Sequence, residues 1–122
     1  MTDFPYRRYP CGRSRTDAGC PFRRDTQPGE FPACRYEALE RTVGSDDAPV
    51  MPGEPIFACH KTSDGREETC AGWLAVCGWH HLGVRIAVLR GLLPPEALEP
   101  GPDWPELFAS YAEMAAHQAR PR

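Results

Sequence analysis

The segment Pro55–Trp79, PIFACHKTSDGREETCAGWLAVCGW, decides how the rest of the chain can fold. It runs from a short apolar stretch ending in Cys59, through a polar loop, to Cys70 at the start of a helical pattern. Two more cysteines, Cys11 and Cys20, precede it. Four thiolates make a full tetrahedral ligand set for zinc. These four residues therefore predict a metal centre that holds a small, loop-rich domain together.

The composition of the chain favours such a staple. The 122 residues include 14 prolines and 11 glycines, and 41% are hydrophobic, so we expect one domain over residues 1–122 with a lean core. The N-terminal MTDFPYRRYP lacks the apolar core of a signal peptide, and no window approaches 18 apolar residues. We therefore expect a cytoplasmic protein without a membrane partner, in which thiols stay reduced and disulfides are the weaker interpretation.

The charges are distributed unevenly. The net charge is −3, yet residues 1–24 carry six arginines against Asp3 and Asp17. A basic arm of this kind can contact the phosphates of a nucleic acid, here through Arg7, Arg8, Arg13 and Arg15. We favour the alternatives that these arginines pair with acids of the chain or balance the charge of a thiolate–metal centre. An unidentified protein is the expected partner.

The pattern of elements predicts a small α+β fold, mostly helical and loop-rich, stapled by a metal site. Residues 1–33 are expected to be an irregular, metal-ligating arm, and residues 55–60 a short strand or one member of a strand pair. Helices are expected over 32–43, 70–91 and 104–118, followed by a frayed tail at 119–122. Asp103 and Glu106 have the spacing of a capping box for the last helix. Trp73 should be buried and Trp79 more exposed.

The ligand set leaves alternatives, because the cysteine spacings are x8, x38 and x10 rather than repeated C-x2-C pairs. Other residues of ligating type lie near the four cysteines and are candidate substitutes: Cys34, Cys77, His60, His80 and His81. For each histidine alone, a surface or hydrogen-bonded role is the simpler interpretation. Cys34 reads best as a small buried hydrophobe.

Four short motifs occur in order along the chain: P-C-G at Pro10–Gly12, C-P-F-R at Cys20–Arg23, A-C-H at Ala58–His60 and C-A-G-W at Cys70–Trp73. This series resembles a small family of unknown function found in actinobacteria and their phages, with the pattern P-C-G-x-C-P-[YW]-R, then C-H, then C-A-G-W. The resemblance covers roughly residues 9–80. It implies that Cys11, Cys20, Cys59 and Cys70 belong together, with His60 and Trp73 nearby. Here eight residues separate the first two cysteines, where the family has two.

Three functions fit this pattern. The first is a structural zinc domain that serves as an accessory or binding module. The second is a [4Fe–4S] protein with a redox or sensing role, since four cysteines from separated segments also bind such a cluster. The third is a metal-dependent enzyme with an open coordination position and His60, His80 or His81 as acid or base. The sequence contains no H-E-x-x-H, phosphate-loop or dinucleotide motif that favours the third.

Overall fold

The computed structural model describes residues 4–12, 19–59 and 65–121. Within these residues the chain is mostly helical and loop-rich, as predicted. Its α-helices are α1 (Ala33–Leu39), α2 (Ala71–Cys77), α3 (Leu82–Leu89) and α4 (Tyr111–Gln118). Three short 3-10 helices accompany them: η1 (Glu40–Thr42), η2 (Gly78–His80) and η3 (Pro95–Leu98). None of these helices is long and apolar enough to cross a membrane.

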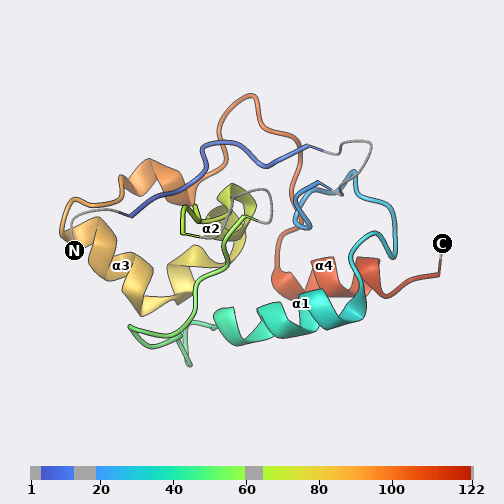
Figure 1. The fold of residues 1–122 in the computed structure, drawn as a ribbon, viewed down its shortest axis with the longest axis horizontal. Coiled ribbons are helices and arrows are strands. Elements are labelled where there is room, and N and C mark those ends of the chain that lie inside the picture. Colours follow the sequence, from blue (N-terminus) through green and yellow to red (C-terminus); the bar gives the residue numbers. More distant parts are fainter. Residues whose placement is uncertain (1–3, 13–18, 60–64, 122) are drawn as a thin grey trace.

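The helices lie around α2, and the irregular chain runs between them (Figure 1). α1 and α4 lie side by side at one end of the molecule, where the Tyr111 hydroxyl donates to the carbonyl oxygen of Tyr36. α3 lies at the other end, beyond α2. The segment before α1 is irregular in its described parts, as the prolines and glycines predict.

β-structure in the described residues consists of isolated bridges. The predicted strand at 55–60 is wrong in extent, because among the described residues 55–59 only Ala58 forms a bridge, antiparallel to Thr69. Thr69 also bridges Tyr6 in parallel, so three distant segments meet at this residue. The pairing stops there because Cys70 leads directly into α2 on one side and a turn precedes Glu67 on the other.

The predicted helix over 70–91 is interrupted. α2 ends at Cys77, η2 follows, and His81 adopts an extended conformation with φ −106° and ψ 116° before α3 begins. His81 caps α3, because its Nδ1 accepts a hydrogen bond from the backbone N–H of Gly83 at 3.0 Å. The backbone here also bonds to another segment, since Leu82 N donates to the Val50 carbonyl at 2.7 Å. These contacts outside the helix replace the helical bonds that periodicity alone predicts.

The predicted last helix begins too early. Residues 104–110 lie outside α4, and Ser110 rather than Asp103 caps the helix by accepting from Glu113 N at 3.1 Å. The preceding chain is instead held against the N-terminal loop, where Phe108 N donates to the Phe22 carbonyl at 2.8 Å. Residues 104–110, where the apolar pattern predicts a helix, therefore form irregular chain.

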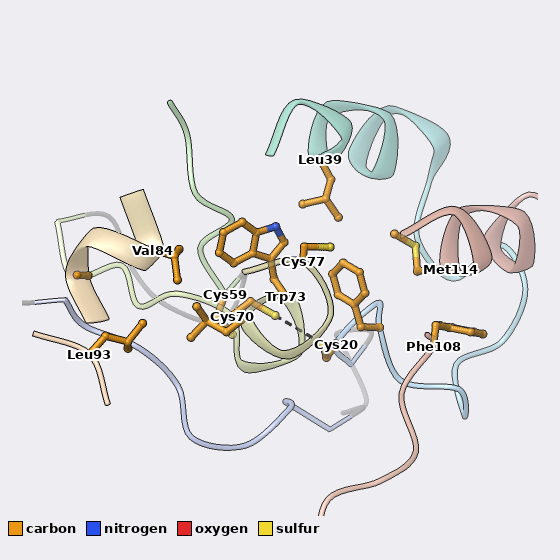
Figure 2. Packing of buried hydrophobic residues seen from close by; sticks show 13 residues of the cluster. Cys20, Leu39, Cys59, Cys70, Trp73, Cys77, Val84, Leu93, Phe108 and Met114 are labelled. Atoms are coloured by element: carbon orange, nitrogen blue, oxygen red, sulfur yellow. Dashed lines mark hydrogen bonds between the residues drawn. The ribbon is translucent and has the colours of Figure 1, made fainter. Parts of the chain in front are cut away.

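The core is centred on Trp73, which is fully buried as predicted, whereas Trp79 is 56% exposed. The indole Nε1 of Trp73 donates to Thr42 Oγ1 at 2.9 Å, and this bond joins α2 to η1. Figure 2 shows the buried residues around Trp73, which come from every part of the chain. They include aliphatic, aromatic and cysteine side chains: Phe22, Leu39, Cys77, Val84, Leu93, Phe108 and Met114.

Candidate metal centre

Cysteine side chains gather beside the first turn of α2. Cys20, Cys59 and Cys70 are buried, and Cys11 is partly exposed. The Sγ atoms of Cys20 and Cys70 lie 3.5 Å apart, marked by the dashed line in Figure 2. A disulfide would require about 2.05 Å. No disulfide joins the described cysteines, so none of the predicted ligands is used in one.

The bridges at Thr69 explain how Cys59 and Cys70 come together. Cys59 N donates to the Glu68 carbonyl at 2.7 Å, and Cys70 N donates to the Phe57 carbonyl at 3.0 Å. Each cysteine is therefore one residue beyond a bridge residue. Since successive side chains of extended backbone point to opposite faces, Cys59 and Cys70 leave on the same face of the crossing.

Arg7 reaches the same face from the N-terminal segment. Arg7 N donates to the Thr69 carbonyl at 2.9 Å, and Thr69 N donates to the Pro5 carbonyl at 2.9 Å. Arg7 is thereby placed one residue beyond the parallel bridge. Its Nε lies 3.6 Å from Glu68 Oε1. One face of the crossing thus carries a guanidinium group beside two thiols.

Cys20 arrives from the loop before α1 and packs against the backbone of α2. A β-carbon placed on Gly72 would lie 2.5 Å from Cys20 Sγ, so only glycine leaves room for this sulfur. Cys11 is tied to the same loop, because Cys20 N donates to the Cys11 carbonyl at 2.8 Å. Arg23 strengthens this connection by donating from Nη1 to the Pro10 carbonyl at 3.2 Å.

The electrostatics of the thiols follow from this geometry. The hydrogen bond with Cys20 is the largest influence that raises the pKa of Cys70 well above its ordinary value, followed by burial and by the charge of Cys20. The backbone N–H of Trp73 acts in the opposite direction. Two thiolates at this distance repel each other in a buried site, so a cation between them would favour their deprotonation.

Two arginines supply positive charge around the cysteines. Hydrogen bonding with Cys59 is the largest influence that raises the pKa of Arg7, and Cys11 contributes to the same shift. The pKa of Arg23 is raised first by its hydrogen bonds to Asp25, which is 2.8 Å away, and less by Cys20. Arg7 thus places positive charge near Cys59 and Cys11, and Arg23 places it near Cys20. Cys70 lies against Cys20.

The residues fit part of a metal site. Within 4–12, 19–59 and 65–121, no group of three or more cysteine, histidine or acidic side chains is arranged so that it could hold a metal ion. The Cys20–Cys70 distance of 3.5 Å is nevertheless close to the edge of a tetrahedron with about 2.3 Å metal–sulfur bonds, which is about 3.8 Å. Arg7 supplies positive charge beside these thiols, because its guanidinium hydrogen-bonds with Cys59. The chemistry of the donors therefore fits a thiophilic cation.

The candidate substitutes lie elsewhere. Cys77 is buried two helical turns beyond Cys70, about 10 Å along α2, and Cys34 is exposed on α1 rather than buried. His80 pairs with Asp46 at 3.1 Å. The buried His81 has Nε2 3.0 Å from the Glu54 carbonyl, and its Nδ1 caps α3. His60 lies outside the described residues.

Of the basic residues proposed for nucleic acid, the structure describes Arg7 and Arg8, and both line the same surface cavity of about 280 Å³. Arg7 faces the thiols and Glu68, whereas Arg8 is exposed and stacks over the ring of Tyr6 at 5.7 Å. Arg13 and Arg15 lie outside the described residues.

Two residues of the centre were missed by sequence reasoning. Gly72 was not singled out within the C-A-G-W motif, and Arg7 was counted among the residues of a basic arm. The C-A-G-W motif contains the signal for Gly72, because a glycine two residues after a cysteine can admit a second sulfur. No local signal identifies Arg7, whose position depends on the distant Thr69.

Two surface cavities, of about 440 and 280 Å³, share Gly101 and Trp104. Neither cavity is lined by a cysteine, although Arg7 lines the smaller one.

A model for a family of unknown function (DUF6283) matches residues 6–122. Comparison with curated proteins gives no match, and comparison with solved structures gives none either.

Proposed function

The chain belongs to the DUF6283 family, whose function is unknown, and we propose that it is a small metal-binding domain with a structural zinc ion held by Cys11, Cys20, Cys59 and Cys70. The observation that carries this proposal is the pair of buried sulfurs of Cys20 and Cys70, which lie 3.5 Å apart and form no disulfide. When bound, the ion would supply no reaction chemistry and would join the N-terminal segment, the Cys20 loop and the start of α2.

The chain's own residues prepare this site. Gly72 leaves room for the Cys20 sulfur, and the bridge between Ala58 and Thr69 brings the backbones of Cys59 and Cys70 together. Arg7 provides positive charge against four thiolates and one divalent ion, which together carry about −2.

Zinc fits better than a [4Fe–4S] cluster. Each cysteine of such a cluster binds a different iron, so the ligand sulfurs lie farther apart than those on a single ion. A distance of 3.5 Å between Cys20 and Cys70 favours two ligands of one tetrahedral ion. We place the protein in a reducing compartment such as the cytoplasm, where thiols are kept available to metals.

The biochemical role that fits this centre is that of an accessory or binding protein. Four thiolates would close the coordination sphere, and His80 and His81 are engaged by Asp46 and by backbone groups. Trp79, which is 56% exposed, stacks on Arg85 at 4.6 Å, and exposed tryptophan and arginine side chains are typical of protein interfaces.

The experiment is elemental analysis of the full chain purified without oxygen. We expect a colourless protein with about one zinc per chain. Serine at Cys20, Cys59 or Cys70 should abolish stoichiometric zinc, and serine at Cys11 should weaken its retention. Cys34→Ser, at the exposed thiol of α1, is the matched control and should keep full zinc content. A brown protein bleached by dithionite, or a metal-free protein that folds normally, would overturn the proposal.

A further inference from the structure

The sulfurs of Cys20 and Cys70 are close enough to react with each other. We propose that this pair is an oxidation site: in the metal-free protein, a hydroperoxide converts Cys20 and Cys70 to a disulfide, and this bond excludes zinc. The exclusion of zinc rests on the proposed function, whereas the disulfide itself does not.

The local backbone allows the bond to form. Formation of the bond shortens the distance between the two sulfurs from 3.5 Å to about 2.05 Å. Cys20 lies in irregular chain before Pro21. Cys70 precedes α2 in an extended conformation, with φ −64° and ψ 128°. Neither cysteine lies inside a helix, so the bond requires no helical hydrogen bond to break.

The positions of the other cysteines favour a bond between Cys20 and Cys70 over other pairings. Cys77 lies about 10 Å farther along α2, and Cys34 is exposed on α1. Gly72 contributes no side chain behind the Cys20 sulfur, so this sulfur packs directly against the start of α2. Cys59 is the competing partner, because it leaves the Thr69 crossing on the same face as Cys70.

Hydrogen peroxide is the oxidant in this reaction. One thiolate attacks a peroxide oxygen, the O–O bond breaks, and a sulfenic acid and hydroxide form. The second sulfur then displaces hydroxide from the sulfenic acid, which leaves as water after protonation. The two sulfurs lose two electrons in total, and the peroxide gains them as it becomes two molecules of water.

The burial of both cysteines limits the rate of this reaction. Cys20 is 0% and Cys70 is 3% exposed, so peroxide reaches them only after local opening. Zinc would hold the segments closed and occupy both sulfurs. Removal of the metal is therefore expected to accelerate oxidation, and a formed disulfide removes two ligands from the site.

The test uses the full chain stripped of metal with a chelator and treated with hydrogen peroxide. Mass spectrometry should show the loss of two hydrogen atoms per chain, and digestion without reductant should yield a linked peptide that contains Cys20 and Cys70. Cys34→Ser should oxidise as wild type does, and Cys70→Ser should not form the bond. A disulfide between other cysteines, or oxygen addition at Cys70 in place of a bond, would overturn the proposal.

A second arm separates this inference from the proposed function. Zinc-loaded wild-type protein should release its zinc on oxidation and bind zinc again after treatment with dithiothreitol. If the purified chain holds no zinc but the Cys20–Cys70 bond forms, the proposed function fails and the oxidation site stands. If the chain binds zinc and its metal-free form yields no such bond, the oxidation site alone fails.

Discussion

Gly72 lies so close to Cys20 that a β-carbon on it would be 2.5 Å from Cys20 Sγ and 3.2 Å from Phe22 Cβ. The first distance is shorter than any van der Waals contact, and the second leaves little room for the side chain to move aside. The first turn of α2 therefore acts as a support for the Cys20 sulfur. Glycine at this position is a requirement of the site rather than of the helix.

Gly72→Ala tests this support. Alanine in a helix is ordinarily more stable than glycine by about 1 kcal/mol, so a gain in stability is expected if Cys20 is not in the way. We expect the opposite, a loss of about 1–3 kcal/mol from overpacking, because the sulfur and Phe22 must shift. The midpoint temperature of thermal unfolding and the zinc content per chain should both fall.

The control for this change is Gly12→Ala, next to Cys11. A β-carbon on Gly12 would meet Arg23 Nη1 at 3.6 Å, an ordinary contact. This variant should keep its zinc content and stability. Equal losses in both variants would mean that the close approach of Gly72 to Cys20 has no special role.

Ser110→Ala tests the start of α4. The Ser110 hydroxyl accepts from Glu113 N at 3.1 Å, while Glu113 Oε1 accepts from Ala109 N at 2.7 Å. Loss of this cap should lower the free energy of unfolding by about 1 kcal/mol, measured by urea denaturation. Asp103→Ala is the matched control and should change it by less than about 0.5 kcal/mol, as an exposed site outside the helix. The reverse order would restore the helix start predicted at Asp103.

The start of the last helix could be predicted from the sequence only as one of two alternatives. Asp103 and Glu106 have the spacing of a capping box, and so do Ser110 and Glu113. Local propensity cannot choose between them. The choice depends on Phe22, whose carbonyl accepts from Phe108 N and so holds this part of the chain outside the helix.

Elements determined by nearby residues were predicted better than those determined by distant ones. The helix after Pro32 and the burial of Trp73 were correct, because a local apolar pattern specifies both. The break at His81 was not, since it depends on Val50 and on the carbonyl of Glu54. The closeness of Cys20 to Cys70 was predicted by ligand chemistry, while the complete ligand set remains a prediction.

Replacement of His81 and replacement of His80 should have different effects on stability. His81 caps α3 through Nδ1 and approaches two carbonyls through Nε2, so His81→Ala should leave buried polar groups without partners. We expect a loss of about 1–3 kcal/mol in the free energy of unfolding. His80→Ala removes only a pair with the exposed Asp46 and should cost less than about 1 kcal/mol.

Zinc content provides the second measurement for both histidine variants. Neither ring is placed at the thiols, so both folded variants should hold as much zinc per chain as wild type. Loss of zinc from a folded His80→Ala or His81→Ala protein would show that histidine replaces a cysteine in the ligand set.

The buried Cys77 makes the stability of the metal-free protein depend on pH. Burial raises the pKa of Cys77 to about 12, and the neighbouring Cys70 adds to the shift. The unfolded chain has an ordinary thiol pKa of about 8.5, so above this pH the unfolded state loses a proton that the folded state keeps. The thiol's contribution to stability is therefore complete below about pH 8.5 and is lost as pH rises toward 12, by about 1.4 kcal/mol per pH unit.

Cys77→Val removes the titrating group while filling a similar volume. In urea denaturation with chelator present, its stability should fall less steeply than that of wild type between about pH 8.5 and 10.5. Cys34→Val, at the exposed thiol of α1, should follow the wild-type slope. Parallel curves for wild type and Cys77→Val would mean that Cys77 titrates alike in both states, which is incompatible with a thiol packed beside Trp73 in the core.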